Sequence, residues 1–215
     1  MPDLMPGAHT LAARLLRQAG TTFADEAGIT LRDKPKPLFQ LLALAMLAGK
    51  PISAEVAVAA ASEVFRSGIR TPASVLHADR ATLIEAFGRA GYARYDESSA
   101  TRLTGLAARV QQRYRGDLRR LADEAAGDIA AAAHALQEFD GIGPVGADIF
   151  LREVQNVWPW VRPYFDDRAL AGAHELSLPE DPEALLDLSG GHPAQLAAAL
   201  VRVSLDHHLR EHVTA

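Results

Sequence analysis

Two glycines and a proline separate two apolar helical patterns in this chain. They lie in the segment FDGIGPVGAD, residues 139–148, and the apolar patterns cover residues 129–139 and 145–157. Glycine permits a positive φ and the close approach of another backbone. Proline is favoured at the first position of a helix, where its missing N–H is not needed. The segment therefore predicts a helix, a tight hairpin and a second helix.

The second helix of this predicted hairpin would begin with backbone amides that have no acceptor inside the helix. These are the amides of Val145, Gly146 and Ala147. At a helix N-terminus such amides, together with the positive end of the helix dipole, form a binding site for phosphate. The alternative interpretation is an ordinary turn between two helices, because short motifs of this kind also occur without function.

The remaining patterns predict an all-α fold of about ten helices joined by short loops. No stretch alternates apolar and polar residues in the way of a strand. Residues 38–47 are nearly all apolar, and their length and their Ala, Leu and Met content favour a buried helix. Residues 193–212 show one long helical pattern that reaches almost to the C-terminus.

Composition excludes several kinds of site. The chain has 215 residues and no cysteine, which rules out disulfides, thiolate zinc sites and cysteine-ligated iron–sulfur clusters. The histidines at the end of the chain lack a Glu-plus-His motif, so we expect no metal site. No run of 18 apolar residues and no signal peptide are found, so we expect no membrane association and a cytoplasmic location.

The formal net charge is −5, with a sequence pI of about 5.9. Most nucleic-acid-binding domains are basic, so this charge argues against a broad electrostatic attraction to nucleic acid. It does not argue against local binding, because a hairpin that holds phosphate with backbone amides needs little side-chain charge.

The hairpin and the residues after it resemble the helix-hairpin-helix superfamily of endonuclease III and alkyladenine DNA glycosylase. In that family a Gly-Ile/Val-Gly hairpin is followed by a catalytic aspartate at a helix start, and here YFDDRAL, residues 164–170, lies at the corresponding distance. The segment PLFQLL, residues 37–42, is similar to the family's first barrel helix. The resemblance covers residues 35–172 and implies two helical lobes, one of residues 37–140 and one of residues 1–36 plus 141–215.

The resemblance implies a DNA glycosylase that removes a damaged or mispaired base from double-stranded DNA in base-excision repair. Bifunctional members carry a lysine two residues after the second hairpin glycine, and it attacks the sugar to form a Schiff base. Val145 occupies that position, so we expect a monofunctional hydrolase without lyase activity. The alternative is a helix-hairpin-helix protein that binds DNA without catalysis. We expect a monomer and no cofactor, apart from a monovalent cation that the family's hairpin carbonyls often hold.

Asp166 and Asp167 are the candidates for the catalytic aspartate. A carboxylate near the sugar stabilises the positive charge that develops as the base leaves. If Asp166 is the N-cap, Phe165 and Leu170 form a hydrophobic staple, and on that ground we prefer Asp166. The alkyladenine branch has an acidic residue just before its catalytic aspartate, which would match Asp167 instead. In the purely structural alternative, one aspartate is the N-cap, and the other is a first-turn residue whose negative charge is stabilised by the helix dipole.

The resemblance also assigns residues to DNA contact and to the base pocket. The predicted DNA-contacting residues are Gly141, Ile142, Gly143, Val145, Gly146 and, as a wedge in a loop, Lys50. A flipped base needs an aromatic or apolar wall to stack against. The candidates for that wall are Tyr92, Tyr95, Trp160 and Tyr164. Each aromatic could instead pack in the core, and Lys50 could be an ordinary solvated lysine.

Overall fold

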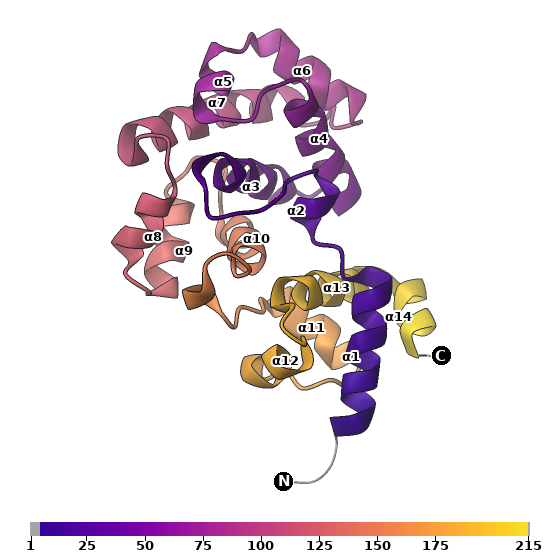
Figure 1. Cartoon of the computed structure of the whole chain (residues 1–215). Coiled ribbons are helices and arrows are strands. Elements are labelled where there is room, and N and C mark those ends of the chain that lie inside the picture. The colour runs from indigo at the N-terminus through magenta and orange to yellow at the C-terminus, as the bar shows by residue number, and fades with distance from the viewer. Residues whose placement is uncertain (1–4, 215) are drawn as a thin grey trace. The chain divides into compact units, whose positions relative to one another are not determined.

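The computed structural model describes residues 5–214, which form fourteen α-helices and one short 3-10 helix and contain no strand (Figure 1). The predicted all-α class is therefore confirmed. The helices number more than the ten expected, because several are short. They divide into two compact units: unit 1 comprises residues 1–23 and 151–215, and unit 2 comprises residues 24–150.

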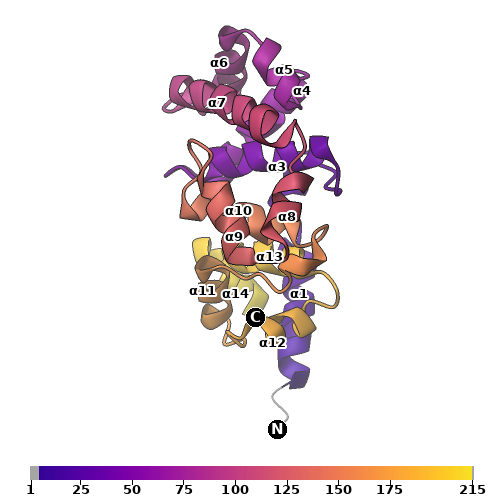
Figure 2. The same ribbon diagram turned by 90° about the vertical axis from the view of Figure 1, so that its left-hand side faces the viewer.

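Unit 2 is built around α3 (Pro35–Ala48), whose ten residues from Leu38 to Leu47 are all buried. In both views α4 to α7 lie on one side of α3 and α8 to α10 on the other (Figures 1 and 2). A helix that is apolar on every face must be covered on every face. The prediction of a buried helix here is confirmed. The other helices of this part of the chain are α2 (Phe23–Glu26), α4 (Ala54–Arg66), α5 (Pro72–His77), α6 (Arg80–Arg89), α7 (Asp96–Tyr114), α8 (Arg119–Ala125), α9 (Ile129–Gln137) and α10 (Pro144–Val154).

Unit 1 is built around α13 (Pro193–Leu205), against which α1 (Met5–Ala19) and α11 (Asp167–Glu175) pack. The α11 contact is unusually close at Gly172. A Cβ atom added to Gly172 would lie 2.0 Å from the carbonyl oxygen of Leu200. Only glycine allows the two backbones to approach in this way. The remaining elements are the 3-10 helix η1 (Pro159–Val161), α12 (Pro182–Leu188) and α14 (His207–Thr214).

The long helix predicted over residues 193–212 is divided in two at Asp206. One carboxylate oxygen of Asp206 accepts hydrogen bonds from the amides of His208 (2.9 Å) and Leu209 (3.1 Å). An aspartate that bonds to amides two and three residues ahead starts a new helix rather than continuing the old one. The apolar periodicity persists across this break, and for that reason the pattern alone did not reveal it.

The observed units differ from the predicted lobes in two segments. Residues 24–36 and 141–150 were predicted to join the C-terminal lobe, but the structure groups both with unit 2. For the hairpin the reason is visible in the packing, because α10 starts against the end of α3. A Cβ atom on Gly49, just after α3, would lie 3.6 Å from the Cα of Gly146.

Candidate nucleic-acid interface and aspartate pair

The predicted hairpin is present between α9 and α10, and Gly141 is its turn residue. Gly141 has a φ of +91°, and a Cβ there would lie 2.9 Å from Cδ of Arg102 and 3.2 Å from Cγ of Met46. The amide of Ile142 donates to the carbonyl of Phe139 (3.0 Å), and the Ile142 side chain is buried. Gly141 and Ile142 therefore shape and anchor the hairpin. Because the Ile142 side chain is buried, the part of this residue that remains for the predicted DNA contact is its backbone.

Two exposed residues at the start of α10, Gly143 and Val145, have backbone amides that are free to bind a ligand. The amides of Gly143, Val145 and Gly146 donate no hydrogen bond within the described part of the chain, but Gly146 is buried against the end of α3. The amide of Ala147, which we expected to be free, donates to the carbonyl of Gly143 (3.0 Å). A Cβ on Gly143 would meet no atom within 4 Å, and the Val145 side chain is 54% exposed. This edge of the hairpin is therefore open to another molecule.

Two basic side chains flank this open edge. The Arg102 side chain packs against Gly141, and Lys50 lies in the loop that follows α3. Partial burial and the nearby charge of Arg102 lower the pKa of Lys50, while Asp140 opposes that shift. Helix dipole, amides and cations together favour an anion here. We refer to these residues as the hairpin surface: Lys50, Arg102, Gly143, Val145 and Gly146.

Asp166 is the N-cap of α11, in the position predicted for it. One carboxylate oxygen accepts from the amide of Ala169 (2.9 Å), and the other accepts from a terminal nitrogen of Arg152. The side chains of Asp166 and Arg152 are only 7% and 4% exposed. The Nε of Arg152 is buried and has no hydrogen-bond partner. Asp166 is thus half of a buried ion pair as well as a helix cap.

Asp167 has a different environment from its neighbour. It is the first residue of α11 and is exposed, and no described residue forms an ion pair or hydrogen bond with its carboxylate. Its negative charge lies at the positive end of the α11 dipole. Burial and the ion pair with Arg152 argue against our preference for Asp166 as catalyst. Of the two carboxylates, the one open to a ligand belongs to Asp167.

A buried polar network supports the segment before α11. Glu153 accepts a hydrogen bond from the amide of Phe23 (3.2 Å). The side-chain amide of Gln155 bonds to both the N–H (3.1 Å) and the C=O (2.8 Å) of Tyr164. Both side chains are buried. Sequence reasoning did not identify Arg152, Glu153 or Gln155. Their one signal is that they interrupt the apolar pattern at the end of α10, where polar residues are usually exposed.

Tyr92, predicted to line a base pocket, lies in the core of unit 2. Its side chain is fully buried, and its hydroxyl donates to the carbonyl of Leu47 (3.1 Å) near the end of α3. No ring face is left for a base. Tyr95 is half-buried, and the guanidinium of Arg94 lies 5.4 Å from its ring centre. Tyr95 alone of these two tyrosines presents part of its ring at the surface.

The other two predicted pocket residues belong to unit 1. Trp160 is half-buried and stacks on buried Trp158, with ring centres 5.6 Å apart and planes inclined by 18°. Tyr164 is also half-buried, and its backbone is held by Gln155. Trp160, Tyr164 and Asp167 therefore lie within a stretch of eight residues, in which the two aromatic residues are half-buried and Asp167 is exposed.

None of the described helices is long and apolar enough to span a membrane. Within residues 5–214, no three His, Asp or Glu side chains are grouped so as to hold a metal ion. No protein-family model matches the chain, and no curated protein sequence matches it.

Proposed function

We propose that the protein binds double-stranded DNA through the hairpin surface. The observation that carries this proposal is the pair of free amides of the exposed residues Gly143 and Val145, at an open edge beside Lys50 and Arg102. Backbone amides at a helix N-terminus bind phosphate without reading sequence. The net charge of −5 leaves the binding dependent on this local site. The affinity should therefore be modest and should fall as salt is raised.

Replacing Gly143 by Asp should weaken duplex binding by about ten- to a hundredfold, the usual effect of losing a hydrogen bond to a charged group. The new side chain has room to form, because a Cβ at Gly143 meets no atom within 4 Å. Its carboxylate would therefore repel a phosphate at the free amides without disturbing the fold. Fluorescence anisotropy with a labelled duplex at low salt measures the change.

Gly88→Asp is the matched control for this measurement. Gly88 is exposed in α6, and a Cβ there also meets no atom within 4 Å. The two variants have the same net charge, so a difference between them reports on position rather than on total charge. Equal duplex affinities for Gly143→Asp and Gly88→Asp would show that DNA does not dock at the hairpin.

We further propose that the bound DNA is a substrate and that the protein is a monofunctional DNA N-glycosylase. The exposed, unpaired carboxylate of Asp167 at a helix start supports this proposal. In the reaction a water molecule replaces the base at the sugar, which leaves an abasic site and the free base. The Asp167 carboxylate would stabilise the positive charge that develops on the sugar. Asp166, as cap and partner of Arg152, would position the start of α11.

Strand cleavage through a Schiff base is not expected from this protein. Val145 occupies the position of the lyase lysine, and the chain has only three lysines, of which Lys34 and Lys36 lie away from the hairpin at the other end of α3. Borohydride reduction in the presence of abasic-site DNA should trap no covalent complex. An adduct that disappears in Lys50→Ala would show that Lys50, with its lowered pKa, acts as the nucleophile and would contradict the monofunctional assignment.

A further inference from the structure

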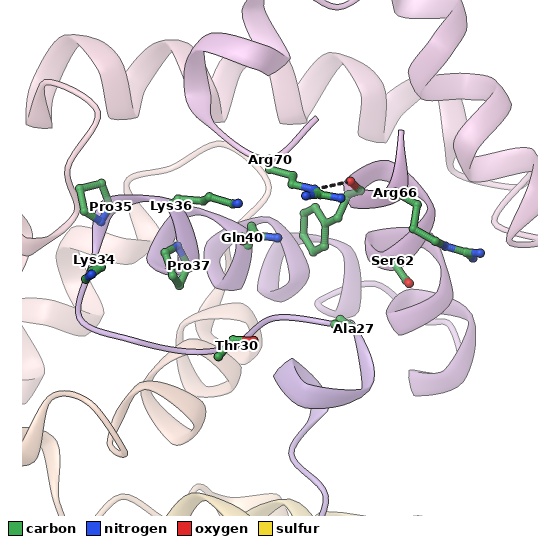
Figure 3. Close-up of a pocket in the computed structure, with 12 residues that line it drawn as sticks. Ala27, Thr30, Lys34, Pro35, Lys36, Pro37, Gln40, Ser62, Arg66 and Arg70 are labelled. Carbon is green, nitrogen blue, oxygen red and sulfur yellow. Dashed lines mark hydrogen bonds between the residues drawn. The ribbon is translucent and has the colours of Figure 1, made fainter. Parts of the chain in front are cut away.

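Unit 2 contains a pocket at the end of α3 that lies away from the hairpin. It has a volume of about 770 Å³ and is formed by the loop before α3, the first turns of α3 and the end of α4 (Figure 3). Small-molecule sites typically have volumes of about 300–1,000 Å³. The α3 helix has fourteen residues. At 1.5 Å per residue, that length places the pocket and the hairpin surface about 20 Å apart.

Four basic side chains line this pocket, and no acidic side chain does: Lys34, Lys36, Arg66 and Arg70. These include two of the three lysines in a chain of net charge −5. Within residues 5–214, no carboxylate pairs with Lys34, Lys36 or Arg70. Arg66 does pair with Glu63, but Glu63 also pairs with Arg89 and so does not neutralise both. The pocket therefore has a local excess of positive charge.

Gln40 adds an uncharged polar group to the wall of this pocket. Its side chain is 6% exposed and lines the pocket, yet no hydrogen bond to its amide group is present within the described residues. Figure 3 shows Gln40 and Lys36 extending from α3 toward the side of the pocket where Arg70 lies. Its Nε2 and Oε1 atoms are not among the described side-chain atoms that are both fully buried and unpaired, so they face the open space of the pocket. A polar ligand in the pocket would find this amide group available for hydrogen bonds.

The start of α3 is unsuited to binding an anion through its backbone. Pro35 and Pro37 have no N–H, and the amide of Leu38 donates to the carbonyl of Lys34 (3.2 Å). Apart from the single amide of Lys36, recognition of an anion must therefore depend on side chains. Arg70 is suited to this role, because its Nε donates to the carbonyl of Phe65 (2.6 Å) and this bond orients the guanidinium.

We propose that this pocket binds a small phosphate-bearing anion, either inorganic phosphate or the phosphate of a mononucleotide. Lys36 and Arg70 hold the phosphate, because Lys and Arg are the usual partners of phosphate oxygens. The Gln40 amide bonds to the ligand at the buried end of the pocket. This proposal goes beyond DNA binding and stands independently of it, because the two sites share no residue.

Isothermal titration calorimetry of the full chain with inorganic phosphate and, separately, with AMP tests the proposal. We expect saturable binding that weakens at least tenfold in Lys36→Ala and in Gln40→Met. Lys36→Arg should retain the binding that Lys36→Ala loses, because arginine keeps the positive charge. Circular dichroism and thermal melting establish that each variant is folded, and Lys36 is exposed, so its truncation should leave the fold intact. Tighter binding of AMP than of phosphate would identify a nucleotide as the source of the phosphate group, and equal binding would identify free phosphate.

Arg17→Ala is the control, because Arg17 is an exposed basic residue of α1 that belongs to neither the pocket nor the hairpin surface. It should leave the binding of phosphate and AMP unchanged. A loss of binding in Lys50→Ala but not in Lys36→Ala would place the anion at the hairpin and overturn the proposal. Absence of saturable binding by both compounds would also overturn it. The proposal would likewise be overturned if Lys36→Ala lowered the affinity for duplex DNA while neither phosphate nor AMP bound to the parent protein.

Discussion

Asp167→Asn is expected to reduce base excision by about a hundred- to a thousandfold, the usual effect of losing one preorganised electrostatic group. The substitution keeps the size of the side chain and removes only its negative charge. Asp167 is exposed and has no partner among the described residues, so the thermal stability should stay close to that of the parent. Single-turnover excision from oligonucleotides that carry a panel of damaged bases measures the rate, and melting measures the stability.

Asp166→Asn is expected to have the opposite effect: it should lower the stability of the protein rather than act mainly on the excision rate. Asparagine caps a helix as well as aspartate does, so the capping bond to Ala169 should survive. The charge of Arg152, however, would remain buried without its partner. Breaking a buried ion pair by removing one partner destabilises a protein by about 3–5 kcal/mol. The double variant Asp166→Asn with Arg152→Met removes both charges and should recover much of that loss, as denaturant titration would measure.

The two aspartates are distinguished by which property each variant loses. If Asp166→Asn keeps the parent's stability but loses excision, Asp166 is the catalyst and its pairing with Arg152 does not persist when DNA binds. If neither change affects a measured excision rate, the catalytic assignment fails. If the parent removes no base from a broad panel but still binds duplex at the hairpin, the protein is a DNA-binding module without catalysis.

Gly172→Ala should destabilise unit 1 by more than about 3 kcal/mol, beyond the usual range for an overpacked core. The added Cβ would lie 2.0 Å from the oxygen and 2.7 Å from the carbon of the Leu200 carbonyl. Both atoms belong to the backbone of α13, so no side chain can rotate to make room. Relief requires α11 and α13 to separate along their contact. Denaturant titration followed by circular dichroism measures the loss.

Gly105→Ala is the matched control, because it makes the same change in a helix with free space. A Cβ on Gly105 in α7 would meet no atom within 4 Å. Alanine favours a helix interior over glycine by about 0.5–1 kcal/mol, so this variant should be slightly more stable than the parent. If Gly172→Ala behaves like Gly105→Ala, the close backbone contact between α11 and α13 does not exist.

The sequence was sufficient to predict those features that depend on local residues. Apolar periodicity identified α3 as a buried helix, and the Gly-Ile-Gly-Pro segment identified the turn between α9 and α10. The N-cap position of Asp166 followed from its neighbours Phe165 and Leu170. Each of these features is decided within about one helical turn, where residue preferences act directly.

What could not be predicted depends on partners distant along the chain. Periodicity shows which face of a helix is apolar but not what covers it. The sequence therefore did not indicate that Arg152 is buried against Asp166. Tyr92 was expected to face a ligand, and it bonds instead to a carbonyl 45 residues earlier. That the side-chain amide of Gln40 has no hydrogen-bond partner among the described residues can likewise be seen only in the structure.

The stacked Trp158–Trp160 pair has a consequence for spectroscopy. The chain contains two tryptophans, and both belong to unit 1, whereas three of its four tyrosines, Tyr92, Tyr95 and Tyr114, belong to unit 2. Emission excited through tryptophan alone therefore follows unit 1, while far-ultraviolet circular dichroism follows the helices of both units. Unfolding curves that coincide by the two signals would indicate a single cooperative transition. The protein thus carries its own optical label for one unit, without any need for a dye.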